Sequence, residues 1–221
     1  MKLYDAMAPH PRVVRMFCDE KGLDLPTVVL SLGIGDTFGA AHLARNPLGQ
    51  VPVLELADGR CIAETVAICE YLEELEPSPA LIGGTPLERA EARMWTERVQ
   101  LNICAPMFLG YRMQAAAVPR YGARVPVALP FDPSGQVKDV AARHLEWLDH
   151  QLDAGPYLCG ERFTLADIFL YCFLDYGIQT GQLLDRSWSR VAAWYDRVDR
   201  RPSVARTAAP QADFAAISGT I

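Results

Sequence analysis

The sequence has little clustered positive charge. It contains 21 lysines and arginines against 27 aspartates and glutamates, with a formal net charge of −6 and no basic run interleaved with aromatic residues. Proteins that bind nucleic acid usually present a basic patch to the phosphates, so no nucleic-acid partner is expected. The four histidines and six cysteines form no cluster with the spacing of metal ligands, and no metal is expected either.

Long hydrophobic runs and paired cysteines are also lacking. The longest apolar stretch, around residues 163–173, is interrupted by Asp167 and is too short to span a bilayer. The opening residues, MKLYDA, contain no apolar core of a signal peptide. No Cys-x-x-Cys motif occurs and the cysteines lie in apolar contexts, so we expect buried free thiols in a reducing cytoplasm and no membrane partner.

The composition is that of an ordinary globular protein: of the 221 residues, half are hydrophobic and 22% are charged. This length allows one large domain or two small ones. The first 75 residues alternate strand and helix patterns, and strand patterns largely stop after them. The expected early elements are a strand at 2–4, a helix from Pro11 to Gly22, a strand at 27–32, a short helix at 40–44 and a helix at 64–75.

The stretch NPLGQVPVLELADGRCIAET, residues 46–65, is the most informative part of the chain. Pro52 cannot donate to a strand ladder, so it must open a strand or lie at an edge, and its peptide bond can be cis. Asp58-Gly59 predicts a two-residue hairpin turn. The returning strand leads into Glu64-Thr65 at the start of a helix, where free backbone N–H groups favour anions. We expect a buried acid there.

This stretch resembles the glutathione-binding half of a cytosolic glutathione transferase. In that family, the residue before a cis-proline pairs through its backbone with the cysteinyl part of glutathione, and an acid followed by Ser or Thr holds the γ-glutamyl end. The resemblance assigns these roles to Val51-Pro52 and to Glu64-Thr65, and it assigns the glycine carboxylate to Gln50. A plain hairpin followed by a capped helix is the alternative interpretation.

The rest of the chain follows the same family order. The resemblance implies a thioredoxin-like domain at 1–76, of the α/β class, a linker at 77–86 and an all-helical domain at 87–221. A long helix at 87–113 should be kinked by Pro106, and a proline-rich loop is expected at 118–135. Thr164 and Asp167 form a capping box whose role we expect to be folding. Further helices are expected at 137–152, from the capping box to about residue 176, and at 187–199. Arg201-Pro202 should end the last of these helices.

The side chain that usually activates the glutathione thiol is absent. Alignment on residues 12–15 places Ala8 where the family usually has a Ser or Cys, and alanine can donate no hydrogen bond. The run Met7-Ala8-Pro9-His10-Pro11 resembles a bacterial and fungal subgroup that has Ala-Pro-Asn-Pro there, in which helix amides and water are thought to hold the thiolate. His10 is the candidate catalytic residue, as a donor to sulfur or an acceptor of the thiol proton; a solvated helix-cap histidine is the alternative.

A second substrate should bind in the helical domain. Met107 and Tyr111 are the candidate lining residues, with Phe108 and Arg112 beside them; all four could equally be core residues. Tyr4 is expected in the core, and His42, His144 and His150 on the surface.

The resemblance therefore implies a homodimeric glutathione transferase that adds glutathione, its co-substrate, to a small hydrophobic electrophile. Two alternatives remain open. One is a glutathione-dependent lyase, dehalogenase or disulfide-bond reductase on the same scaffold. The other is a non-catalytic interaction module, which the absence of a catalytic hydroxyl favours and the retained Glu64-Thr65 pair opposes.

Overall fold

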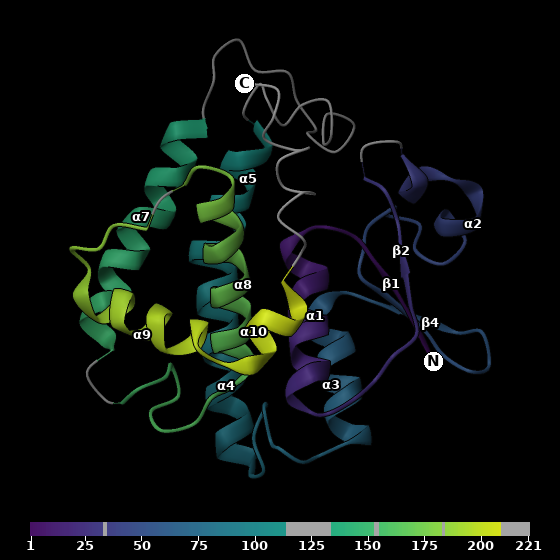
Figure 1. The fold of residues 1–221 in the computed structure, drawn as a ribbon, viewed down its shortest axis with the longest axis horizontal. Helices are drawn as coiled ribbons and strands as arrows, with labels where there is room; N and C mark the ends of the chain where they lie inside the picture. Colours follow the sequence, from purple (N-terminus) through teal and green to yellow (C-terminus); the bar gives the residue numbers. More distant parts are fainter. Residues whose placement is uncertain (33–34, 114–133, 153–154, 183, 209–221) are drawn as a thin grey trace.

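A computed structural model describes residues 1–32, 35–113, 134–152, 155–182 and 184–208. Its first part is a small sheet with helices on both faces (Figure 1). In chain order the elements are β1 (Lys2–Asp5), α1 (Pro9–Glu20), β2 (Thr27–Val29), the 3₁₀ turn η1 (Asp36–Phe38), α2 (Ala40–Leu43), β3 (Val53–Glu55), β4 (Cys61–Ala63) and α3 (Thr65–Leu75).

The four strands lie in the order β2-β1-β3-β4. Strand β1 runs parallel to β2, with Leu3 opposite Thr27, and antiparallel to β3, with Leu3 opposite Leu54. Helices α1 and α3 lie between the sheet and the helical part, and α2 lies on the other side of the strands (Figure 1). Leu3 and Leu54 are buried in the core, and the arrangement confirms the expected thioredoxin-like fold class.

Three local expectations for the first part need correction. Helix α1 begins at Pro9, not Pro11. Both prolines fit in the first turn because N–H groups there have no partner within the helix, so the missing N–H costs nothing. Strand β2 ends at Val29 and is exposed throughout. The hairpin loop has three residues, since the Leu56 N–H bonds the Arg60 carbonyl at 2.7 Å; Gly59, at φ 85°, supplies the left-handed position.

The second part is a bundle of helices around α8 (Figure 1). Nearly every residue of α8 is buried, as its uniformly apolar sequence predicts. The elements are α4 (Pro86–Val99), the π-helical turn η2 (Gln100–Cys104), α5 (Ala105–Met113), α7 (Ser134–Gln151), α8 (Leu165–Gln179), α9 (Ser189–Asp199) and α10 (Pro202–Thr207).

The interruption expected at Pro106 is present as the π-helical turn that precedes it. Proline has no N–H to bond the carbonyl four residues back, that of Asn102, and a widened turn accommodates the loss. Most of the loop expected at 118–135 lies outside the described residues. Its last two residues belong instead to α7, which begins at Ser134.

The capping box before α8 forms as expected. The Asp167 carboxylate accepts the Thr164 N–H at 2.9 Å, and it also accepts the Leu158 N–H at 2.9 Å and the Trp194 indole N–H at 2.8 Å. One fully buried carboxylate therefore joins the start of α8, the preceding loop and α9.

Helix α9 ends at Asp199, ahead of Arg201-Pro202, as expected, and Pro202 then begins the short helix α10. Arg201 pairs with Glu20 at the end of α1, at 2.6 Å. Further along α1, Arg12 forms an ion pair with Asp175 of α8. These contacts attach α1 to the helical part. In the portion of the chain that the structure describes, no helix is long and apolar enough to cross a membrane.

Candidate functional site

The loop before β3 presents its backbone beside a cavity. The Val51–Pro52 peptide bond is cis; Gln50 is exposed, Val51 half-buried and Pro52 buried. The Gln50 carbonyl accepts two hydrogen bonds, from His42 Nε2 and from Asn46 Nδ2, both at 3.0 Å. Because a carbonyl can only accept, Nε2 of His42 carries the proton.

His42 was expected on the surface but is buried, with only 3% of its surface exposed. Its ring lies edge-on to Tyr4, at a centroid distance of 6.2 Å. Tyr4 itself is a core residue, as expected, and its hydroxyl donates to Glu55 at 2.8 Å. His144 is half-buried on α7, and of the three only His150 is exposed.

At the start of α3, the two residues of the Glu64-Thr65 pair differ in burial. Glu64 is the N-cap residue, at φ 71°, and its side chain is exposed, while Thr65 is the first helical residue and is buried. The expectation of a buried acid is therefore wrong, and the buried polar group is the threonine hydroxyl. A positive φ is uncommon outside glycine and marks a backbone held by its surroundings.

His10 lies in the first turn of α1, close to α3. Its Nδ1 atom is 3.1 Å from Thr65 Oγ1. The rings of Phe173, Phe169 and Phe108 lie nearly perpendicular to the imidazole, with the nearest centroid, that of Phe173, at 4.8 Å. Burial, and then the charge of Arg112, lower the pKa of His10 to about 4, so the imidazole is neutral at neutral pH.

A small cavity of about 100 Å³ lies between these elements. It brings together sequence candidates from distant segments: the loop before β3 and the first turn of α1 both reach it. Its described lining residues are Ala8, His10, Leu32, Gln50, Val51, Phe108 and Arg112.

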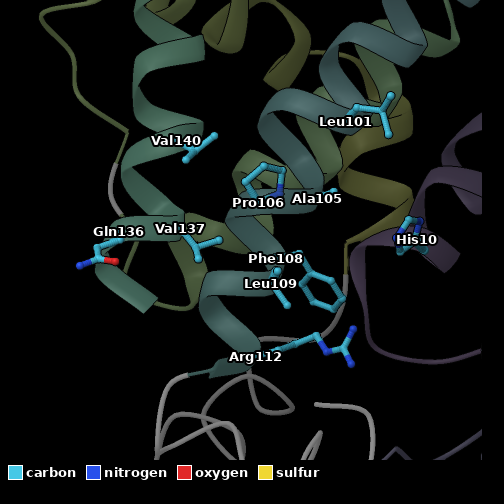
Figure 2. A pocket seen from close by; sticks show the side chains of 10 residues that line it. All are labelled: His10, Leu101, Ala105, Pro106, Phe108, Leu109, Arg112, Gln136, Val137 and Val140. Carbon is cyan, nitrogen blue, oxygen red and sulfur yellow. The ribbon is translucent and has the colours of Figure 1, made fainter. Parts of the chain in front are cut away.

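A larger cavity of about 650 Å³ lies beside the small one (Figure 2). Helix α5 forms its middle wall, α7 lies on one side and His10 on the other. Apart from His10, Arg112 and Gln136, its described lining is apolar. The residues are His10, Leu101, Ala105, Pro106, Phe108, Leu109, Arg112, Gln136, Val137 and Val140.

Met107 and Tyr111 do not line either cavity. Both are buried, each with 7% of its surface exposed, and Tyr111 packs against Phe108 and Tyr176. The cavity side of α5 instead presents Phe108 and Arg112. Residues 101, 105, 108 and 112 recur at helical spacing, and this periodicity could have identified the lining face.

All six cysteines are free thiols, four of them buried. None lines either cavity among the residues described above. In the described ranges, no three histidine, cysteine or carboxylate side chains gather as metal ligands would.

Both parts of the chain match a known family. Residues 8–75 match the model described as "Glutathione S-transferase, N-terminal domain", and residues 94–197 match "Glutathione S-transferase, C-terminal domain". Glutathione S-transferase 2 of Saccharomyces cerevisiae is 33% identical over 207 residues, covering 92% of this chain and 88% of that protein.

Two further similarities extend over most of the chain. The crystal structure of Gtt2 from Saccharomyces cerevisiae aligns with a TM-score of 0.85 at 32% identity, covering 94% of this chain and all of that one. A protein named FtsZ-localized protein A, from Caulobacter vibrioides, is 31% identical and covers 88% of this chain and 84% of its own length.

Proposed function

Because the chain belongs to the glutathione S-transferase family, we propose that it is an enzyme that binds glutathione and transfers it to a small hydrophobic electrophile. The observation that carries the proposal is the small cavity, where the backbone before a cis-proline meets the first turn of α1. The apolar cavity beside it offers room for the second substrate.

Each part of glutathione has a proposed partner. The backbone of Val51, ahead of Pro52, pairs with the cysteinyl residue, and Gln50 reaches the glycine carboxylate. Glu64 and Thr65 hold the γ-glutamyl end, where Thr65 offers its hydroxyl and the start of α3 offers backbone N–H groups to the carboxylate. Phe108 and Arg112 replace Met107 and Tyr111 as the proposed lining of the electrophile site.

The proposed reaction begins when the thiol of glutathione loses its proton to water. The thiolate then donates an electron pair to the electrophilic carbon, a C–S bond forms, and the leaving group departs with the electrons of the broken bond. A free thiol has a pKa of about 8.5, so the site must favour the thiolate.

His10 takes part in this proposal only as a neutral group. A base with a pKa of about 4 is far too weak to hold a proton taken from a thiol. The neutral ring can still donate a hydrogen bond, either to sulfur or to Thr65. We therefore assign His10 to positioning and hydrogen bonding within the site.

Calorimetric titration with glutathione tests binding, and turnover of 1-chloro-2,4-dinitrobenzene with release of chloride tests transfer. We expect micromolar to millimolar affinity and measurable turnover. S-methylglutathione, which has no thiol, should bind but not react. A folded protein that shows no heat with glutathione at millimolar concentration would refute the proposal.

The alternative glutathione-dependent enzymes on the same scaffold would form different products. A reductase that works through a mixed disulfide with the protein would need a cysteine where this chain has Ala8, so this route is disfavoured. A lyase or dehalogenase would share the thiolate and differ in the electrophile, which a panel of epoxides, haloalkanes and activated alkenes distinguishes. The similarity to FtsZ-localized protein A favours an interaction module as the second candidate, and this candidate predicts no glutathione binding.

We further propose a homodimer located in the cytoplasm. Helices α3 and α4 present a mixed polar surface, in which Arg93 pairs with Glu70 at 2.7 Å, and twofold association is the commonest assembly of identical chains. Light scattering should give about twice the 24.4 kDa mass of the chain. A monomer at micromolar concentration would contradict the dimer and leave the enzyme proposal standing.

A further inference from the structure

We propose that the large cavity selects electrophiles that carry a long unbranched alkyl chain, and that Leu101, Ala105 and Leu109 form the surface along which this alkyl chain lies. The proposal rests on the proposed function, because it assumes that glutathione occupies the small cavity. It narrows the hydrophobic electrophile to one shape, a reactive head beside the glutathione sulfur and an aliphatic tail that extends away from it.

The three residues form an exposed aliphatic row on one helix face. Leu101 lies in the π-helical turn η2, and Ala105 and Leu109 follow on α5 at intervals of four residues, the spacing that places side chains on the same face of a helix. All three are exposed, with 58% of the surface of Leu101 and 36% of that of Leu109 accessible. All three also line the large cavity. The apolar side chains that the core leaves exposed are therefore gathered where a ligand can cover them.

Helix α7 supplies the facing wall. Val137 and Val140, both half-buried, line the cavity from α7, across from the row (Figure 2). Two aromatic rings occur among the described lining residues, those of His10 and Phe108, and both of these residues also line the small cavity. A flat aromatic electrophile would find ring surfaces only near the sulfur, whereas an alkyl tail would contact aliphatic side chains along the rest of the cavity.

The length of the lining sets the length of the tail. From Ala105 to Arg112, α5 rises about 10 Å, and Leu101 lies about one turn before Ala105, so the lining extends over roughly 15 Å. An extended alkyl chain advances about 1.2 Å per bond, because the three backbone bonds of a residue span about 3.6 Å. A tail of about ten carbons therefore matches the lining, and the cavity volume of about 650 Å³ is in the range of small-molecule sites.

The head of the electrophile would lie where the two cavities share residues. His10, Phe108 and Arg112 line both cavities, and Phe108 and Arg112 lie at the end of the lining opposite Leu101 (Figure 2). A tail attached to a carbon beside the glutathione sulfur can thus extend from this shared end, along Leu109 and Ala105, toward Leu101.

A 2-alkenal is one electrophile of this shape. The thiolate donates an electron pair to the β-carbon and a C–S bond forms, while the π electrons of the alkene move to the carbonyl oxygen as an enolate. Water then protonates the α-carbon, so no leaving group departs. Each methylene of the tail that is removed from water should strengthen binding about two- to fourfold.

The test is calorimetric titration with S-alkylglutathiones from S-methyl to S-decyl, which are stable mimics of the product. We expect the affinity to rise about two- to fourfold per methylene and to level off near ten carbons. S-benzylglutathione should bind less tightly than S-heptylglutathione, which carries the same number of carbons in an extended form. The kcat/KM for 2-alkenals, from 2-butenal to 2-decenal, should rise in parallel.

Two variants locate the tail. Ala105→Phe places a ring in the middle of the row, and it should weaken binding of S-decylglutathione at least tenfold while leaving that of S-methylglutathione unchanged. Leu101→Ser removes the apolar far end, and it should weaken only the S-octyl and S-decyl ligands. Ala193→Phe is the matched control, because Ala193 is exposed on α9 and lines neither cavity, and it should leave the whole series unchanged.

The outcomes separate this inference from the transferase proposal. Affinity that does not depend on alkyl length, or a series that rises equally in wild type and Ala105→Phe, would overturn the inference, while binding of S-methylglutathione would leave the transferase proposal standing. Equal losses of the S-methyl and S-decyl ligands in Ala105→Phe would also overturn it. Failure of the wild-type protein to bind glutathione and every S-alkylglutathione would refute both.

Discussion

The Nδ1 atom of His10 lies 3.1 Å from the hydroxyl oxygen of Thr65, joining the first turn of α1 to the start of α3. A threonine hydroxyl can accept one hydrogen bond and donate another. With a proton on Nδ1, the neutral His10 directs the Thr65 hydroxyl proton away from itself, which leaves that proton for the proposed γ-glutamyl carboxylate of glutathione. His10 can thus orient the hydroxyl of Thr65, a proposed glutathione-binding group, without exchanging a proton.

The buried His10 should make the protein acid-sensitive. Its pKa is lowered from 6.5 to about 4 in the folded state, so the unfolded chain binds more protons between these values and stability falls as pH falls through that window. Relative to His10→Gln, wild type should lose about 2 kcal/mol of unfolding free energy between about pH 7 and pH 5. Urea titration at both pH values measures this difference.

His150→Gln is the control for that experiment, because it removes an exposed imidazole from α7. A constant difference between wild type and His10→Gln across the window would mean that His10 titrates normally and that burial does not hold it neutral.

Glu64 and Thr65 should contribute to glutathione binding by different routes. Glu64→Ala removes an exposed carboxylate that we propose binds the γ-glutamyl end of glutathione, and it should cost about 1.5–3 kcal/mol in binding, the range for hydrogen bonds to charged groups. Thr65→Ala should lose both the ligand contact and the contact with His10, while Thr65→Ser should retain most of the affinity. Calorimetric titration of the folded variants with glutathione measures these changes in affinity. Unchanged affinity in Glu64→Ala would remove Glu64 from the site.

Asp167 should matter for stability and not for binding. Its carboxylate is fully buried, and it accepts hydrogen bonds from Leu158, Thr164 and Trp194. Asp167→Ala leaves these donors unsatisfied, which should lower the unfolding free energy by about 3 kcal/mol or more. Urea unfolding measures the loss, with the exposed Asp139→Ala as control. Weaker glutathione binding at a temperature where the variant is fully folded would contradict a purely structural role.

The sequence predicted features that arise from local covalent chemistry better than those that arise from packing. Pro52 and Pro106 interrupt their elements where expected because a missing N–H acts locally. Thr164 and Asp167 form their cap because they lie three residues apart. The burial of His42 and the placement of Arg112 at the cavities depend on contacts between segments far apart in the chain, which no local pattern specifies. For α5, the sequence analysis named residues of both helix faces as candidates; helical spacing separates Phe108 and Arg112 from Met107 and Tyr111, but tertiary packing decides which of the two faces meets the cavity.

The last prediction concerns the two side chains that hold the Gln50 carbonyl. His42 and Asn46 both donate to this oxygen at 3.0 Å, and the following residue, Val51, is the proposed backbone partner of glutathione. His42→Phe keeps an aromatic ring in the core and removes one donor, so the loop should lose preorganisation. We expect glutathione affinity to fall about five- to tenfold, which corresponds to about 1–1.4 kcal/mol, with the KM for the electrophile unchanged.

Arg45→Met is the control, since Arg45 lies on the same segment but pairs with Glu55 and not with the carbonyl. If His42 only fills space, His42→Phe and wild type should bind glutathione equally. In the double variant His42→Phe/Asn46→Ala, the two losses should not add, because both donors act on one oxygen.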